Sequence, residues 1–283
     1  MMLDDTTLRI LACQIDVPCI TNSAERDAHL RTSAVKVRTE LAKTEVDLVA
    51  LPELSSIDYA RETFANLADI AEPLDGPSFE CWRQVAMEFG VYVSFGFARQ
   101  EGEKYYISNA VIAPSGDLVG HFDKLHLAQF GASMEKEYFR GGDHVFVYDI
   151  KGFTIAPIIC YDIRIPELTR TLVIDHQADL ILHSGAYYRD ESFHTWHSFT
   201  TTRALENQVF FLSLNRAGDK YGNSVMSWPW MDENRRPVSF EKHAEDFRVL
   251  TLVKSELTAA RENYSFLADR FGDYGALPKL PSS

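Results

Sequence analysis

The chain has 283 residues, a net charge of −13 and a hydrophobic content of 46%. This length suits one large α/β domain or two ordinary ones, and the composition is that of a folded globular protein. The acidic balance and the absence of a basic patch argue against nucleic acid as a partner.

The four cysteines show no zinc or disulfide spacing, and the N-terminal stretch "MMLDDTTLRI" lacks the regions of a signal peptide. No apolar run approaches the roughly 20 residues of a membrane span. We therefore expect a cytoplasmic protein with free thiols and no membrane partner.

The first half of the chain alternates between strand-like and helix-like segments. A strand is predicted at 8–16, then a helix whose residues Leu30, Ala34, Val37 and Leu41 share one face. Asn22 is its candidate N-cap, with the acid of a capping box three residues later. The next predicted elements are a strand at 47–53, a helix from Pro77 to Gly90, and three successive strands at 91–100, 105–114 and 117–124.

The second half begins with a loop-rich segment at 125–143. Strands are predicted at 145–150, 153–162, 179–186 and 208–215, and helices at 166–176 and 193–207. A β-rich tail and a short helix at 256–263 follow. Because strands and helices interleave throughout, we expect a single domain over 1–283, with mixed sheets in the middle and helices outside.

Three predicted strands carry functional groups at their ends, namely Glu53, Lys124 and Cys160. Loops beyond strand ends are where α/β proteins build sites. If the three strands lie side by side, a carboxylate, an ammonium and a thiol converge.

Together these groups suit nucleophilic catalysis by the Cys160 thiol. A helix beginning near Pro166, together with Lys124, would lower the pKa of the thiol. Glu53 would take its proton and return it to a leaving amine. Lys124 and the backbone N–H of Tyr161 would stabilise an oxyanion.

Each residue also has a structural interpretation: a packed cysteine, a solvated glutamate and an exposed lysine. Metal binding is a further alternative, because His126, His183, His194 and His197 are available. However, no HExxH motif occurs, and we expect no metal.

The motifs "LVALPEL", "DKLHL" and "IICYDIRIPEL" stand around these residues in this order. Together with "SNAVIAPSGDLVGHFDK", "EKEYFRGGD", "RALENQVF" and "YGNSV", they resemble the nitrilase (carbon–nitrogen hydrolase) superfamily from 8 to about 253.

This resemblance implies a four-layer α-β-β-α sandwich and a triad of Glu53 as base, Lys124 as oxyanion stabiliser and Cys160 as nucleophile. It also implies a second carboxylate, for which Glu135 is the first choice and Glu137 the fallback. It implies no cofactor, a small-molecule amide substrate, and a homodimer or larger oligomer formed through the helix after the cysteine and the C-terminal tail, about 254–283.

The substrate class follows from the residues after the nucleophile. Tyr161 stands where nitrile-converting members commonly have tryptophan, and "CYDIR" is similar to omega-amidases. This favours a linear amide that bears a carboxylate, with Arg164 gripping the carboxylate. The alternatives are an internal ion pair of Arg164 with Glu167 or Asp162, an N-carbamoyl hydrolase, and a catalytically silent binding protein.

Some positions depart from the pattern of the superfamily. Asp58 replaces a frequent glycine, and Asp123 replaces a frequent basic residue beside Lys124. Asp123 would either tune the charge of the lysine or face solvent. Trp228 and Trp230 occupy an unusual stretch and would line the pocket, an interface or the core.

Overall fold

The computed structural model describes residues 6–280 and contains two six-stranded sheets. The first sheet has the order β12 (Asp246–Val253), β1 (Thr7–Gln14), β2 (Leu48–Ala50), β3 (Tyr92–Glu101), β4 (Lys104–Ile112) and β5 (Leu118–Asp123). The second has the order β11 (Val238–Ser239), β10 (Val225–Ser227), β9 (Phe210–Leu214), β8 (Leu180–Ser184), β7 (Phe153–Ile159) and β6 (Tyr148–Ile150).

Both sheets are mixed, as expected. In the first, β1, β2 and β3 run parallel, whereas β12, β4 and β5 pair antiparallel to their neighbours. In the second, β7, β8 and β9 are parallel, and the outer strands are antiparallel.

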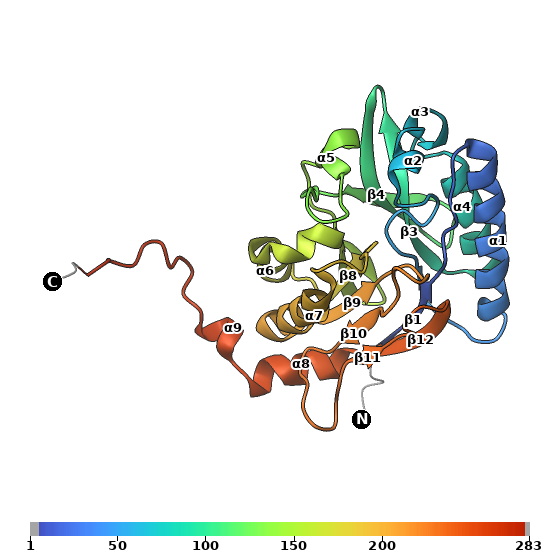
Figure 1. Ribbon diagram of the computed structural model, residues 1–283. Coiled ribbons are helices and arrows are strands. Elements are labelled where there is room, and N and C mark those ends of the chain that lie inside the picture. Colours follow the sequence, from blue (N-terminus) through green and yellow to red (C-terminus); the bar gives the residue numbers. More distant parts are fainter. Residues whose placement is uncertain (1–5, 281–283) are drawn as a thin grey trace.

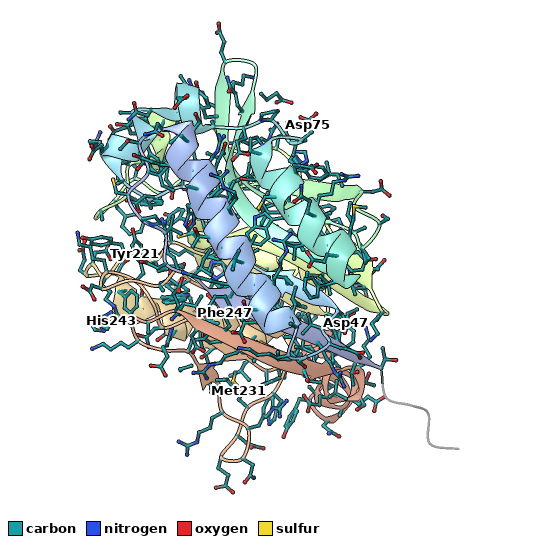
Figure 2. The ribbon with its side chains drawn as sticks, turned by 90° about the vertical axis from the view of Figure 1, so that its right-hand side faces the viewer. Asp47, Asp75, Tyr221, Met231, His243 and Phe247 are labelled. Atoms are coloured by element: carbon teal, nitrogen blue, oxygen red, sulfur yellow. The ribbon has the colours of Figure 1, made fainter. Side chains whose placement is uncertain are left out.

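Helices cover the outer faces of the two sheets (Figure 1). The longer ones are α1 (Ser23–Leu41), α4 (Pro77–Phe89), α6 (Pro166–Ile174), α7 (Phe193–Asn207) and α8 (Lys254–Asn263). The short ones are α2 (Arg61–Phe64), α3 (Leu67–Ile70), α5 (Glu135–Tyr138), α9 (Phe266–Asp269) and the 3₁₀ helix η1 (Cys160–Arg164). Figure 2 faces α1 and α4, which lie over the first sheet.

Alternation along β1 shows how the layers form. Leu8 and Ile10 belong to the apolar cluster between the two sheets, whereas Leu11 and Cys13 pack in the cluster under α1 and α4. A third cluster joins the second sheet to α6 and α7. Since burial of each such side chain contributes about 1.5–3 kcal/mol, these three interfaces hold the layers together. The predicted α-β-β-α order is therefore confirmed.

The N-terminus of α1 also follows the sequence-based expectation in part. The side chain of Asn22 accepts a hydrogen bond of 3.0 Å from the Glu25 N–H. The Glu25 carboxylate accepts hydrogen bonds from the Thr21 N–H at 2.8 Å and from the Thr21 hydroxyl at 3.0 Å. The cap is thus present, and the main partner of the acidic residue is the residue before the cap.

The chain after α9 runs away from the body of the molecule (Figure 1). Along residues 6–280, no helix combines the length and the apolar character required to cross a bilayer.

Candidate active site

Glu53 lies in the turn after β2, three residues beyond the end of the strand. Strand β3 passes close behind it, since a Cβ atom on Gly96 would lie 2.9 Å from the Glu53 Cα. The side chain is buried, and its Oε2 accepts a hydrogen bond of 2.7 Å from the Ala186 N–H. Burial raises the pKa of Glu53, an effect that nearby Lys124 opposes.

Lys124 follows β5 and is completely buried. Its Nζ donates to Glu53 Oε1 at 2.8 Å and to Glu135 Oε1 at 2.6 Å. Burial alone would lower the pKa of Lys124, but the charges of the two carboxylates outweigh it and raise the pKa well above its ordinary value. Lys124 is therefore an ammonium group at neutral pH.

Glu135, at the start of α5, is the second carboxylate and is also completely buried. Its Oε1 accepts a hydrogen bond of 2.7 Å from the Tyr59 hydroxyl, and its Oε2 accepts one of 2.8 Å from the Ala128 N–H. Glu137, by contrast, is solvent-accessible and pairs with Arg61. The geometry favours Glu135, the first choice from the sequence, over the fallback.

Cys160 is the first residue after β7 and the first of η1. Its backbone has a φ of +44°, in the left-handed region that residues with a Cβ atom rarely adopt. Such a conformation at a strand end turns the side chain out of the sheet, and it is a form of backbone strain that clusters at functional sites.

The expectation of a lowered thiol pKa is wrong. Burial raises the pKa of Cys160 well above its ordinary value, the charge of Glu53 adds to this effect, and Lys124 and the Ala186 N–H oppose it. The resting group is therefore a neutral thiol. An adjacent base must remove its proton during attack.

The assumption that the three strands lie side by side is also wrong. Strand β2 is separated from β5 by two other strands of the first sheet, and β7 belongs to the second sheet. The three residues nevertheless converge from strands of both sheets, because Lys124 contacts Glu53 at 2.8 Å and the charges of both act on the pKa of Cys160.

Cys160 opens into a pocket formed by loops from both halves of the chain. Its lining includes Tyr161 and Arg164, both singled out from the sequence, and further residues from three segments, namely Tyr59, Ala128, Phe130, Ser133, Ala186, Tyr187, Tyr188, Asp190 and Ser192. Tyr161 packs near Phe130 with ring centroids 5.4 Å apart.

Arg164 makes neither of the ion pairs that the sequence left open. The Asp162 carboxylate is occupied by the backbone N–H groups of Ile159 and His126 and by the His126 ring. No ion pair between Arg164 and Glu167 is found among the residues described. The guanidinium instead lies between two aromatic rings, 5.3 Å from the centroid of Phe130 and 5.1 Å from that of Phe199, and its buried Nη2 has no hydrogen-bond partner in residues 6–280.

The two unusual aspartates have structural partners. Asp123 is buried and forms a bidentate pair with Arg99, at 3.0 and 2.6 Å, and also accepts a hydrogen bond from Ser108. The alternative in which it faces solvent is therefore wrong. Asp58 accepts a hydrogen bond of 2.8 Å from the Tyr59 N–H and lies 3.5 Å from the Arg216 guanidinium.

Three of the four histidines considered as metal ligands have other partners, and His194 is exposed. His126 binds Asp162 at 2.7 Å, His183 binds the Cys160 carbonyl at 3.0 Å, and His197 binds the Asn223 carbonyl at 2.7 Å. Across residues 6–280, no three His, Cys, Asp or Glu side chains form a group that could hold a metal ion.

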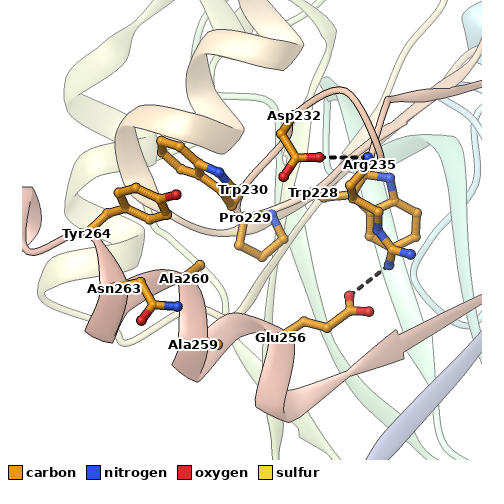
Figure 3. Close-up of a pocket in the computed structure, with 10 residues that line it drawn as sticks. All are labelled: Trp228, Pro229, Trp230, Asp232, Arg235, Glu256, Ala259, Ala260, Asn263 and Tyr264. Carbon is orange, nitrogen blue, oxygen red and sulfur yellow. Dashed lines mark hydrogen bonds and ion pairs between the residues drawn. The ribbon is translucent and has the colours of Figure 1, made fainter.

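A larger cavity, of about 390 Å³, lies between α8 and the loop before β11, and contains none of the residues predicted for catalysis (Figure 3). Trp228 is buried at its wall beneath Arg235, whereas Trp230 stacks on Tyr264 with ring centroids 3.6 Å apart. Neither tryptophan lines the pocket of Cys160.

Sequence reasoning missed two contributors to the site. The Ala186 N–H binds Glu53, and the Tyr59 hydroxyl binds Glu135. Ala186 is the last residue of a predicted strand. Its place at a strand end could have indicated a backbone N–H that points into the site. Nothing local distinguishes Tyr59 from other tyrosines.

Comparison with known proteins supplies independent information. A family model described as carbon-nitrogen hydrolase matches residues 10–236. Omega-amidase NIT2-A of Xenopus laevis is 31% identical over 244 residues, covering 81% of this chain and 87% of the relative. A nitrilase of Pyrococcus abyssi is 32% identical over 193 residues, covering 68% and 70%.

The fold is likewise similar to solved structures. The crystal structure of Saccharomyces cerevisiae Nit3, a member of branch 10 of the nitrilase superfamily, matches with a TM-score of 0.79 at 20% identity. The match covers 91% of this chain and 94% of the yeast chain, which supports the sandwich fold.

Proposed function

Since the chain belongs to the carbon–nitrogen hydrolase family, we propose that it hydrolyses the C–N bond of a small linear amide through a cysteine thioester. The observation that carries this proposal is the buried ammonium of Lys124, held at 2.8 Å by Glu53 and at 2.6 Å by Glu135, beside a cysteine at a strained turn. Burying three ionisable groups is costly unless they pair, and such arrangements are typical of catalytic sites.

The reaction begins with the neutral thiol of Cys160. Glu53 takes the thiol proton while the sulfur bonds to the amide carbon. The carbonyl oxygen becomes an oxyanion, which the Lys124 ammonium and the Tyr161 N–H stabilise. Collapse breaks the C–N bond, Glu53 returns the proton to the leaving nitrogen, and ammonia departs from a thioester.

Water then completes the turnover. Glu53 takes a proton from water as the oxygen attacks the thioester carbon, and the second oxyanion uses the same two donors. Breakage of the C–S bond releases the carboxylic acid and returns the proton to Cys160. Glu135 orients the substrate or the water and, through Lys124, holds the positive charge in place.

Arg164 supports a substrate that carries a carboxylate at the end away from the amide. Arg164 lines the pocket that contains Cys160, and its buried Nη2 has no protein partner in the part of the chain that the structure describes. A buried guanidinium N–H is expensive to leave unpaired, and a carboxylate satisfies it with charge-assisted hydrogen bonds. The name of the Xenopus laevis relative, an omega-amidase, agrees with this substrate class.

The test is a panel of amides, N-carbamoyl compounds and nitriles assayed for ammonia, with Cys160→Ala as the matched variant. We expect ammonia from amides, most from those bearing a carboxylate, and none above background from Cys160→Ala. A thioester adduct on Cys160, detected by mass spectrometry after rapid acid quenching, would identify the intermediate.

Other outcomes of the same panel identify the rival functions. Carbon dioxide released together with ammonia from carbamoyl compounds alone would indicate an N-carbamoyl hydrolase. Ammonia from nitriles alone would overturn the amidase assignment. Binding of an amide without turnover by the unmodified protein would indicate a catalytically silent binding protein.

We further propose that two or more copies of the chain associate through α6, the helix after the cysteine, and the C-terminal segment. After α9 the chain exposes large apolar side chains, namely Phe271, Tyr274, Leu277 and Leu280. Exposed apolar side chains concentrated in one segment favour an intermolecular contact. Sedimentation velocity should give a dimer or larger for the full chain and a smaller species after truncation beyond residue 270; a monomeric full chain would contradict this proposal.

A further inference from the structure

The peptide group between Cys160 and Tyr161 is held from its carbonyl end. The Cys160 carbonyl oxygen accepts two side-chain hydrogen bonds, one from His183 Nε2 at 3.0 Å and one from the Tyr187 hydroxyl at 3.0 Å. Both side chains are buried, with exposed fractions of 0% and 5%. The other end of this peptide group is the Tyr161 N–H, which the reaction above uses as an oxyanion donor.

His183 is itself held by a chain of hydrogen bonds that reaches across two strands and a helix. His183 on β8 and Ser213 on β9 are direct neighbours in the parallel register, and Trp196 lies above them on α7. His183 Nδ1 lies 2.6 Å from Ser213 Oγ, and Trp196 Nε1 donates to the same oxygen at 2.7 Å. The side chains of all three residues are completely buried.

The direction of every bond in this chain follows from its end groups. An indole N–H can only donate, and a carbonyl oxygen can only accept. Nε2 of His183 therefore carries the hydrogen, Nδ1 is the acceptor, and the single hydroxyl hydrogen of Ser213 points to Nδ1. Burial also lowers the pKa of His183 to about 3, so the ring is neutral at physiological pH.

These bonds act on the N–H because the peptide group is planar. Fixing the carbonyl oxygen fixes the direction of the Tyr161 N–H on the opposite side. As the second residue of η1, Tyr161 has no intrahelical acceptor for this N–H, which leaves it free for a ligand. Two donors on the carbonyl also polarise the group, which strengthens the N–H as a donor.

We propose that His183, oriented by Ser213 and Trp196, acts with Tyr187 as a positioning pair that aims and polarises the Tyr161 N–H toward the oxyanion. This inference rests on the proposed thioester mechanism and goes beyond it. It assigns a role to His183 and Tyr187, whose hydrogen bonds given above reach neither the Cys160 sulfur nor the carboxylates of Glu53 and Glu135.

The test separates oxyanion formation from placement of the thiol. Hydrolysis of an amide forms an oxyanion, whereas alkylation of Cys160 by iodoacetamide displaces iodide from a saturated carbon and forms none. His183→Leu removes the donor, His183→Gln keeps a donor near Nε2, and Tyr187→Phe removes only the second hydroxyl. Each variant is assayed for kcat and KM on the best amide of the panel, and Cys160 alkylation is followed by peptide mass mapping.

We expect His183→Leu and Tyr187→Phe each to lower kcat by about 10-fold or more, with KM and the alkylation rate within about 2-fold of the unmodified protein. His183→Gln should recover most of kcat. An alkylation rate that falls in parallel with kcat, an unchanged kcat, or a Gln variant as slow as the Leu variant would each overturn the proposal.

Two controls keep the result interpretable. Thermal melts identify a variant that fails to fold, and Tyr187→Phe, which keeps the ring that stacks 4.6 Å from Trp196, carries the test if His183→Leu fails. An inactive unmodified protein would refute the proposed function. If the unmodified protein is active, Cys160→Ala abolishes its activity, and the His183 and Tyr187 variants keep the same kcat, only the positioning role is refuted.

Discussion

Replacing Arg164 by methionine should remove the preference for carboxylate-bearing amides and leave uncharged amides nearly unaffected. A hydrogen bond to a charged group contributes about 1.5–3 kcal/mol. Loss of this contribution corresponds to a decrease of about 10- to 150-fold in kcat/KM. The decrease should appear for glutaramate and be absent for pentanamide, because the two compounds differ only at the end away from the amide.

The folded state should tolerate this change because two effects oppose each other. Methionine loses two cation–π contacts, with Phe130 and Phe199, which are worth about 0.5–1 kcal/mol each at partly exposed sites. It also removes a buried Nη2 without a partner, which relieves about 1–3 kcal/mol of desolvation. We therefore expect a small change in the free energy of unfolding.

The assay compares kcat/KM for both substrates by ammonia release. Arg170→Met is the matched control, because Arg170 lies six residues further along the chain, on α6, and outside the lining of the Cys160 pocket. An equal loss on glutaramate and pentanamide would mean that Arg164 only shapes the pocket. An unchanged ratio, or the same effect from Arg170→Met, would refute carboxylate recognition by Arg164.

Three further predictions concern the buried charges. Lys124→Met should abolish turnover. It should also lower the free energy of unfolding by about 3–5 kcal/mol in urea titrations, because it leaves two buried carboxylates without their cation. An unchanged free energy of unfolding would contradict this prediction. Burial raises the pKa of Glu53, and Glu53 must be ionised to act as the base. kcat/KM should therefore fall on acidification with an apparent pKa above that of an ordinary carboxyl group. A kcat/KM that stays constant down to about pH 5 would contradict this prediction. The hydrogen bond to Asp162 raises the pKa of His126 in the folded protein, so its proton-linked stabilisation is present at low pH and lost as pH rises through that value. His126→Asn should therefore reduce the free energy of unfolding more at about pH 5.5 than at about pH 9. The difference should be less than about 1 kcal/mol because the His126 ring is partly exposed. An equal reduction at both pH values would contradict a stabilising pair of His126 and Asp162.

Local patterns predicted most of the elements and placed the sheets in the middle and the helices outside, whereas the four-layer order came from the family resemblance. The apolar run of β1 supplies both faces of its sheet with buried side chains, and the single apolar face of α1 determines which side of the helix is buried. Pro77 and Gly90 mark the ends of α4 because proline suits a first helical turn and Gly90 has a φ of +66°. The short helices α2 and α3 escaped prediction, since four residues carry little periodicity.

The convergence of the candidate residues was predictable from the sequence, but their electrostatics only in part. The positions after strands singled out Glu53, Lys124 and Cys160, which the structure brings together, but the pKa of the thiol depends on burial, which arises from segments distant in the chain. The partners of Arg164 could not be deduced from spacing, because Phe199 approaches it from α7 and Phe130 from the loop before α5. The bonds of His183 likewise depend on strand register, which its own segment does not specify.

The three residues of the proposed mechanism are divided between the two sheets, with Glu53 and Lys124 anchored in one and Cys160 in the other. Neither sheet alone therefore holds all three residues. Any loosening that lets the sheets slide, even with each sheet intact, would separate the Cys160 thiol from Glu53, so under the proposed mechanism loss of turnover should precede loss of secondary structure during gradual denaturation.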